Sequence, residues 1–432
     1  MKKPAVPLNK AEGELIAKAE EVLRGNLKTG FSKWANTNYK YICPASGHYR
    51  HQWFWDSCFN AIVLSHLNID LAKNEIRSLL KVQRENGFIP HIIYWDQHNH
   101  NNLLTSLGAR LESKFSASPT TSELIQPPLI AQAVEAIYKK EKDVKFLQEV
   151  VPKLKAYYLW LSKYRDPDRD GLISIIAPYE SGLDQSPAYD TVFGTANRSS
   201  LISALVGRSV TLRNLLRNYN TKKIFEDGYF NVEDVLVNSI YIKNLQVLSD
   251  LLHEIDNEEA ARHFHHKALK GKETLIEHCY DKEDSFFYDM AGQSEKKIKA
   301  KTIKGLLPLI LDLPKTVVGN IVKNHVLNNK EFSLPYPIPT VAASEASFAP
   351  AAKRFFGEPL LWRGPTWINT NWYIVSGLRK HGYKKEAEQI VEKSVELVQK
   401  SGFREFFNPF SGEGYGAHDF SWSTLVVDML LS

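Results

Sequence analysis

Along most of the chain, apolar residues recur every three or four positions, which places them on one face of an α-helix. Stretches of alternating apolar and polar residues are few and short, the clearest being residues 88–94 and 285–288. The pattern therefore predicts an all-α protein. The thirteen predicted helices cover residues 11–23, 57–66, 71–84, 128–139, 144–164, 198–215, 232–253, 258–278, 303–311, 316–327, 366–380, 384–400 and 422–431.

Residues at the ends of two predicted helices support their boundaries. Asp56 can cap the helix that begins at Ser57, because aspartate is a preferred N-cap. Gly87 follows the charged end of the helix over 71–84, as a C-terminal glycine does. Just before Ser57, an extended Trp-Phe-Trp-Asp stretch would point Trp53 and Trp55 the same way and leave Phe54 to pack behind them.

Many of the predicted helices follow one another as pairs with short links. Each helical hairpin has one apolar face, and closing the hairpins into a ring buries all these faces together. An open solenoid would show a repeat of fixed period, and the chain has none. We therefore expect an (α/α)6 barrel in a single domain over residues 1–432, with no Pro/Ser-rich linker. The polar segment 98–122 is the longest loop, and we expect it to act as a lid.

Composition narrows the class of protein. The chain has 432 residues, 43% of them hydrophobic, and a formal charge of only +5 that is dispersed along it. No basic block indicates nucleic-acid binding, and no apolar run indicates a membrane span. Three cysteines without metal-type spacing, and no signal peptide, favour a reducing compartment. We expect a cytoplasmic protein and leave its oligomeric state open.

Tryptophan is unevenly distributed. Seven of the nine tryptophans fall within residues 49–56, 90–95, 362–372 and 403–422, and each stretch also carries ionisable side chains. Such mixtures are typical of sugar-binding sites, since the rings stack on the sugar and polar neighbours bind its hydroxyls. The four stretches predict one carbohydrate site assembled from the whole chain.

Two segments carry carboxylates that could act in catalysis. In residues 177–190, Pro and Gly break the helical pattern around Glu180, Asp184 and Asp190, which could instead form turns. In residues 403–422, aromatic neighbours of Glu405 would raise its pKa by desolvation, although an ion pair with Arg404 is the alternative. Glu413, between two glycines, is expected to be more exposed.

Two acids in an aromatic pocket are the minimum set for a glycosidase, in which one protonates the leaving oxygen and the other activates water or attacks the sugar. A non-catalytic sugar-binding toroid and an (α/α)6 lyase or phosphorylase are the alternatives. We expect no cofactor and no metal. The turn Asp166–Gly171 begins like a calcium loop, but its twelfth position is Ala177 instead of glutamate. A helix-terminating turn is therefore the preferred interpretation, with calcium as the alternative.

Four motifs resemble glycoside hydrolase family 63: His51-Gln-Trp-Phe-Trp-Asp-Ser57, Glu180-Ser-Gly-Leu-Asp-Gln-Ser186, Trp362-Arg-Gly-Pro-Thr-Trp367, and the stretch from Glu405 to Trp422. The resemblance covers about residues 40–432. It is nearest to short bacterial and plant members that hydrolyse mannosylglycerate or glucosylglycerate, and more distant from trehalases. It implies an (α/α)6 barrel and an inverting mechanism on a small α-glucoside or α-mannoside, with a trehalase-like α-glucosidase as the alternative.

The resemblance also implies roles for single residues. Asp184 matches the general acid and Glu405 the general base, with Glu413 as the competing base. Glycerate-cleaving relatives carry, in a loop after the acid, an arginine followed six residues later by tyrosine, and the matching region, about Arg198 to Tyr229, shows no clear version of this motif. The residues expected around the sugar are Tyr49, Trp53, Trp55, Asp56, His91, Gln126, Trp362, Trp367, Glu413 and Trp422.

Overall fold

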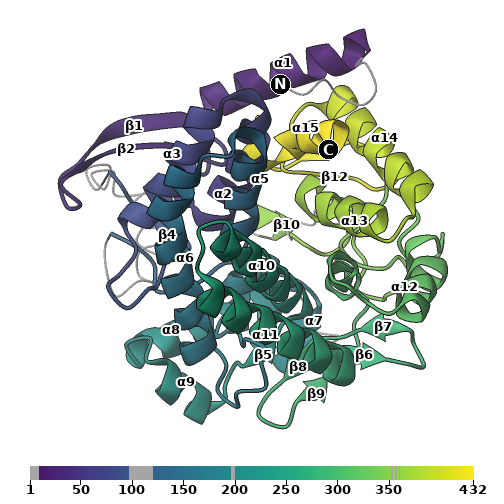
Figure 1. Ribbon diagram of the computed structural model, residues 1–432. Coiled ribbons are helices and arrows are strands. Elements are labelled where there is room, and N and C mark those ends of the chain that lie inside the picture. Colours follow the sequence, from purple (N-terminus) through teal and green to yellow (C-terminus); the bar gives the residue numbers. More distant parts are fainter. Residues whose placement is uncertain (1–8, 97–119, 196–199, 352–353, 356–357, 360) are drawn as a thin grey trace.

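A computed structural model of the protein describes residues 9–96, 120–195, 200–351, 354–355, 358–359 and 361–432 (Figure 1). Helices dominate it, as the periodicity predicts. The α-helices are α1 (Lys10–Gly25), α2 (Phe54–Leu67), α3 (Ile69–Lys81), α5 (Ile130–Glu141), α6 (Val144–Tyr164), α7 (Ala188–Val192), α8 (Ser200–Leu216), α9 (Thr221–Asp227), α10 (Val235–His253), α11 (Glu258–Thr274), α12 (Lys315–Ile321), α13 (Ile368–Lys380), α14 (Lys384–Ser401) and α15 (Val426–Leu431).

The described residues also include five short helical segments of other types. Three are 3-10 helices and two are π-helical turns that continue α11 and α12. Their bounds are η2 (Pro178–Ser181), η3 (Leu275–Cys279), η4 (Ile303–Ile310), η5 (Val322–Val326) and η6 (Ser421–Leu425).

Six of these segments close into a ring. Helix α2 packs on α5, α5 on α10, α10 on η4, η4 on α13, and α13 on η6, which returns to α2. A second layer surrounds the ring: α3 packs on α2 and α5, α6 on α5 and α10, α11 on α10, and α14 on α13. This is the (α/α)6 barrel that the sequence predicts. The ends meet where α1 packs on α15, at the top of Figure 1.

The two layers differ in how their residues are buried. Helix α2 buries 12 of its 14 residues and α10 buries 15 of its 19, because both are enclosed by neighbours on all sides. The outer helix α14 buries only a stripe of six residues that recur at helical spacing. A helix that is buried on all sides belongs to the core, whereas an amphipathic helix covers the core with its apolar face. The hydrophobic core therefore lies inside the inner ring and between the ring and the outer helices.

Strands are short and peripheral. The longest pair is a hairpin of β1 (Leu27–Ser32) and β2 (Thr37–Ile42), whose register runs from Leu27 opposite Ile42 to Ser32 opposite Thr37. It projects from the ring in Figure 1 and was not predicted. The other strands are two residues long: β3 (Gln52–Trp53), β4 (Ile92–Ile93), β5 (Val232–Glu233), β6 (Tyr280–Asp281), β7 (Phe286–Phe287), β8 (Met290–Ala291), β9 (Lys296–Lys297), β10 (Arg354–Phe355), β11 (Glu358–Pro359), β12 (Phe406–Phe407) and β13 (Gly414–Tyr415).

Several predicted boundaries are wrong for local reasons. The segment over 303–311 is a 3-10 helix, since Pro308 lacks an N–H and Gly305 packs directly on Phe286. The helix predicted over 71–84 ends at Lys81. Gly87 has a φ of 99° and belongs instead to a turn, in which its own N–H donates to the carbonyl of Arg84.

The prediction of a lid over 98–122 falls mostly outside the described residues, since 97–119 are not among them. Its last residues are fixed to the strand β4. Tyr94 N–H donates to the carbonyl of Thr120, and Ser122 N–H donates to that of Ile92. Within the described ranges, no helix combines the length and the apolar character needed to cross a membrane.

Candidate active site

The residues expected around the sugar gather where the inner segments begin. Trp55 and Asp56 lie in the first turn of α2, and Trp367 immediately precedes α13. Trp422 is the second residue of η6, and Gln126 lies just before α5. The starts of four ring members thus contribute to one region, although the segments that supply them are far apart in the sequence.

Glu405 is held in a fixed orientation beneath this region. Its side chain is 5% exposed. The Tyr49 hydroxyl donates to Oε1 at 3.0 Å, and the Ala417 N–H donates to Oε2 at 2.9 Å. The alternative of an ion pair with Arg404 is not realised, because that guanidinium contacts His418 and the carbonyl of Gly416. The carboxylate is therefore oriented by two neutral donors.

Asp184 lies in the loop after η2 and accepts a hydrogen bond from the indole of Trp362. Its side chain is partly exposed while its carboxyl group is enclosed by protein, and this burial raises the pKa of Asp184 to about 6. Trp362 itself has a φ of 64°, a left-handed conformation that is costly for a bulky residue. Such strain persists only where the surroundings hold the residue in place.

The two acids influence each other electrostatically. Burial raises the pKa of Glu405 to about 7, and the nearby negative charge of Asp184 contributes to the rise. The pKa of Asp56 is also raised well above its usual range, by burial and by the charge of Glu405. Three carboxyl groups from three distant segments are therefore close enough to interact. Near neutral pH, the three carboxyl groups therefore titrate as a set, and a bound proton is not assigned to any one of them.

Asp56 does not cap a helix, contrary to the prediction. Helix α2 begins at Phe54, so Asp56 is its third residue. The cap comes from elsewhere in the chain, since Gln126 Oε1 accepts a hydrogen bond from the Trp55 N–H at 3.0 Å. Asp56 Oδ1 is buried and has no hydrogen-bond partner among the described residues. The carboxylate is thus free to bind a ligand.

Trp53 and Trp55 do not point the same way from an extended strand, because the helix starts between them. Trp53 lies edge-on to Tyr49 and His91, with ring centroids 6.1 and 5.6 Å apart. The ring of Trp55 packs closely over Gly182, two residues before Asp184, where an added Cβ would clash with the indole. The two tryptophans therefore line different parts of the site.

His91 is a neutral hydrogen-bonding group. Burial lowers its pKa to about 3, so the imidazole is uncharged at neutral pH. Its Nδ1 lies 2.5 Å from the hydroxyl of Ser122, which leaves Nε2 for another partner. The backbone carbonyl of His91 also accepts from the Phe54 N–H at 2.9 Å, and so ties this segment to the start of α2.

A stack of aromatic rings forms another wall of the site. Trp362 and Trp367 lie parallel with centroids 3.5 Å apart, and Trp367 stacks on Phe406 at 4.7 Å. Trp422 meets Trp55 edge-on at 5.6 Å and donates from its indole to the carbonyl of Glu405. The rings therefore connect the segment that carries the base candidate to the one that carries Trp362.

The other acids of the Asp184 loop are structural. Glu180 is fully buried and forms a bidentate ion pair with Arg165, at 2.6 and 2.7 Å, while also accepting from the N–H groups of Ile125 and Ile176. Asp190 forms a bidentate pair with Arg363 at 2.7 and 2.8 Å. These pairs fix both ends of the loop between them, and so position Asp184.

Glu413 lies apart from this arrangement. Its side chain is exposed next to the hairpin of β12 and β13 and accepts from the hydroxyl of Tyr415 at 3.1 Å. An exposed carboxylate is poorly placed to hold a single water molecule away from solvent. Of the two base candidates, Glu405 is the buried one and is oriented by two donors.

Sequence reasoning missed three residues that shape the site. In the sequence Arg363 stands out only as part of a motif, although it anchors the segment that carries Trp362. Ser122 orients His91, and Asn369, at the start of α13, has a buried amide nitrogen without a partner among the described residues. The only signal for them is their proximity in sequence to predicted site residues.

Several known hydrolases of small glycosides are similar to this chain. A mannosylglycerate hydrolase from Thermus thermophilus is 30% identical over 95% of this chain and 99% of its own length. A glucosylglycerate hydrolase from Mycolicibacterium hassiacum is 24% identical over 88% of this chain and 91% of its own length. The crystal structure of a family 63 mannosylglycerate hydrolase from Thermus thermophilus with Tris and D-glycerate superposes with a TM-score of 0.79, at 28% identity, and covers 96% of this chain and 99% of that one.

Residues 49–423 match the profile of the mannosylglycerate hydrolase MGH1-like glycoside hydrolase domain. That range begins at Tyr49, which donates to the base candidate, and ends just after Trp422, so it contains every residue assigned above to the site. With fold, motifs and profile in agreement over most of the chain, we conclude that it belongs to glycoside hydrolase family 63 and is a glycoside hydrolase.

Proposed function

We propose that this enzyme hydrolyses a small α-glucoside or α-mannoside with inversion, with Asp184 as the general acid and Glu405 as the general base. The observation that supports this most strongly is the pair of enclosed, mutually interacting carboxyl groups, each with a raised pKa. We further propose that the whole ring acts as one catalytic domain. Three buried free thiols, Cys43, Cys58 and Cys279, suit a reducing compartment such as the cytoplasm.

Each of the two acids accepts one backbone and one side-chain hydrogen bond. Glu405 accepts from the Ala417 N–H and from Tyr49, and Asp184 accepts a backbone bond and the bond of Trp362. The pKa values of about 6 for Asp184 and about 7 for Glu405 are close enough for a single proton to be carried by either acid of the pair. The roles therefore rest on the sequence motifs: in the proposed reactive form Glu405 is the anion, and Asp184 keeps the proton that the glycosidic oxygen needs.

In the proposed reaction, Glu405 takes a proton from a water molecule as its oxygen attacks the anomeric carbon. The bond to the glycosidic oxygen breaks, and Asp184 gives that oxygen its proton. An α-glycoside yields the β-anomer and a neutral alcohol. The water needs room, so we expect the two carboxyl groups to lie about 6.5–9.5 Å apart in the working enzyme.

Unpartnered polar atoms indicate where the sugar hydroxyls bind. Within the described structure, Asp56 Oδ1 and the indole nitrogens of Trp53 and Trp367 are buried without a hydrogen bond. Leaving such groups unpaired costs about 1–3 kcal/mol each. A sugar offers hydroxyls that both donate and accept, and so would satisfy all three while its apolar face stacks on the rings.

The aglycone is the less defined half of the substrate. Relatives named for glycerate glycosides suggest a small acidic alcohol. Described arginines in the matching region have other partners: Arg213 stacks on the Tyr229 ring at 3.6 Å, and Arg217 pairs with Asp227 at 2.5 Å. We therefore propose a short aglycone, either glycerate held by other groups or a related small alcohol.

A product-release screen tests the proposal. The purified enzyme is incubated with glucosylglycerate, mannosylglycerate, trehalose and simple α-glucosides and α-mannosides, and free sugar is measured. We expect turnover of at least one short α-glycoside and no turnover of the β-linked counterparts. Hydrolysis of β-glycosides alone, or retention of anomeric configuration by NMR, would contradict it.

A further inference from the structure

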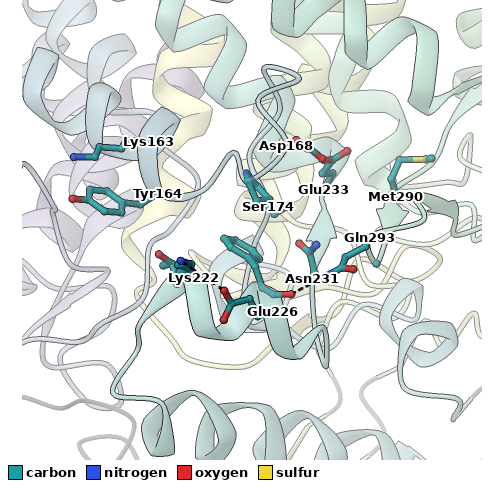
Figure 2. A pocket seen from close by; sticks show the side chains of 14 residues that line it. Lys163, Tyr164, Asp168, Ser174, Lys222, Glu226, Asn231, Glu233, Met290 and Gln293 are labelled. Atoms are coloured by element: carbon teal, nitrogen blue, oxygen red, sulfur yellow. Dashed lines mark hydrogen bonds and ion pairs between the residues drawn. The ribbon is translucent and has the colours of Figure 1, made fainter.

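A cavity of about 470 Å³ lies away from the active site (Figure 2). It is bounded by the end of α6, helix α9, strand β5 and the turn after β8, and neither Asp184 nor Glu405 lines it. On one side of this cavity, Asp168 and Glu233 face each other in Figure 2. They belong to a larger group of carboxylates from three separate segments of the chain.

The first segment is the turn after α6, where Asp166, Asp168 and Asp170 come together. One carboxylate oxygen of each can lie within 4.8 Å of the others. Asp166 and Asp170 also each use one oxygen to accept an N–H of the turn itself, from Gly171 and Leu172. Their other oxygens, Asp166 Oδ1 and Asp170 Oδ2, are buried and have no partner within the described ranges.

The other two segments bring further oxygen ligands. Glu233 of β5 and Glu295, between β8 and β9, place carboxylate oxygens within 4.8 Å of Asp168 and of each other. Glu233 is only 5% exposed, yet its Oε2 lacks a partner among the residues described. Asn231, 8% exposed, lines the same cavity, and its amide oxygen Oδ1 is likewise unpartnered.

Few cations balance these charges. His278 lies 3.1 Å from Glu295, while Lys297 and Lys299 pair with Asp281 instead. Burial raises the pKa of Glu233 to about 9, and the charges of the neighbouring carboxylates contribute to the rise. Burying like charges and an unpaired amide oxygen together is costly unless a cation binds.

We propose that this cluster binds one Ca²⁺, with Asp168 and Glu233 as central ligands and oxygens of Asp166, Asp170, Glu295 and Asn231 around them. Every candidate donor is an oxygen, and six to eight oxygens suit Ca²⁺. Mg²⁺ instead requires near-ideal octahedral geometry and usually keeps several water molecules, so a site built almost wholly from protein oxygens favours the larger ion.

The site explains how a calcium loop can lack its twelfth-position glutamate. In this chain that position is Ala177, and the glutamate is supplied instead by Glu233 from β5, 67 positions after Asp166. Ile175 pairs with Val232 beside Glu233, and the chain then runs directly into the loop that carries Asp184. The ion would therefore fix the segment that leads to the general acid.

Calorimetry and thermal unfolding test the site on the full-length enzyme after dialysis against EGTA. We expect one equivalent of Ca²⁺ to bind with a Kd in about the micromolar range, and about 1 mM CaCl2 to raise the Tm by several degrees. MgCl2 at the same concentration should raise it much less. Absence of saturable Ca²⁺ binding by the chelated enzyme would overturn the proposal.

Variants distinguish a specific Ca²⁺ site from nonspecific attraction of Ca²⁺ by negative charge. Glu233→Gln should weaken Ca²⁺ binding at least about 100-fold while melting in EGTA no lower than the unmodified enzyme, because glutamine keeps the shape of a side chain whose raised pKa leaves it neutral when no ion is bound. Asp168→Asn, at an exposed position, gives the same test if the first variant does not fold. The matched control is Glu226→Gln, which lines the same cavity outside the cluster and should bind Ca²⁺ normally. Unchanged affinity in both Glu233→Gln and Asp168→Asn would refute the assignment.

Discussion

The indole of Trp362 donates a hydrogen bond to the carboxylate of Asp184 from a backbone held at a φ of 64°. The neighbours of Trp362 hold it there. The Leu361 N–H donates to Gln185 Oε1 at 2.7 Å, and Arg363 forms its bidentate pair with Asp190. Gln185 belongs to the Asp184 loop, and Asp190 belongs to α7, which follows that loop. The segment around Asp184 therefore positions Trp362, which donates the hydrogen bond to Asp184.

Arg363→Lys tests this positioning. Lysine keeps the charge but loses the two-pronged contact with Asp190. The hydrogen bond from Trp362 should weaken, and because that bond lowers the pKa of Asp184, the pKa should rise. We expect kcat to fall roughly tenfold, with the alkaline limb of the pH profile moved upward. Arg379→Lys, which disturbs a surface pair with Glu388, is the control. A fall in kcat without a shift of the pH profile would indicate that the substitution disrupts the site in general and that Arg363 does not act by positioning Trp362.

Asp184→Asn removes the proton donor while keeping the shape of the side chain. On substrates with poor leaving groups we expect kcat to fall by up to about four orders of magnitude. An activated substrate, such as an α-glycosyl fluoride, needs little protonation and should lose much less. Comparing the two substrate types with one enzyme preparation gives the measurement. Equal losses on both would assign Asp184 a positioning role.

Glu405→Gln and Glu413→Gln distinguish the two base candidates. Loss of the base should cost about two to four orders of magnitude in kcat. Glu405 is buried and oriented by two donors, whereas Glu413 is exposed, so we expect only Glu405→Gln to be inactive. NMR of the unmodified reaction should show the β-anomer as the first product. An active Glu405→Gln enzyme together with an inactive Glu413→Gln enzyme would reverse the assignment.

Much of the architecture was predictable because it depends on local patterns in the sequence. Helical periodicity marks α2, α10 and α14, and the aromatic clusters mark the site. What could not be predicted depends on contacts between distant residues. Nothing near Trp55 indicates that Gln126 caps its helix, and nothing near Glu180 indicates that Arg165 neutralises it. The role of 98–122 as a lid stays a prediction.

The pH dependence of kcat/KM should be a narrow bell, since the productive free enzyme carries one proton on the Asp184–Glu405 pair. The pKa values are about 6 for Asp184 and about 7 for Glu405, and for an interacting pair they describe the two steps of the pair. At a pH below the lower pKa, a second proton binds to the pair, and the base can no longer take a proton from water. At a pH above the upper pKa, the pair holds no proton for the leaving group.

Initial rates across the pH range, with enzyme stability checked at each pH, give this profile. The maximum should lie between the two steps. With an activated substrate the alkaline limb should flatten, because protonation of the leaving group is no longer needed. Rates that are constant from acidic to alkaline pH would contradict a shared proton.

Asp56→Asn separates binding of the sugar from stability of the fold. Because Gln126 caps α2 and Asp56 does not, replacing a buried carboxyl whose pKa is raised should leave the Tm unchanged or slightly higher. The neutral amide makes a weaker hydrogen bond to a sugar hydroxyl, so kcat/KM should fall by about 1.5–3 kcal/mol of transition-state stabilisation. Gln126→Ala is the counterpart: it removes the cap and should lower stability by about 1 kcal/mol. Unchanged kinetics in Asp56→Asn would remove Asp56 from the sugar site.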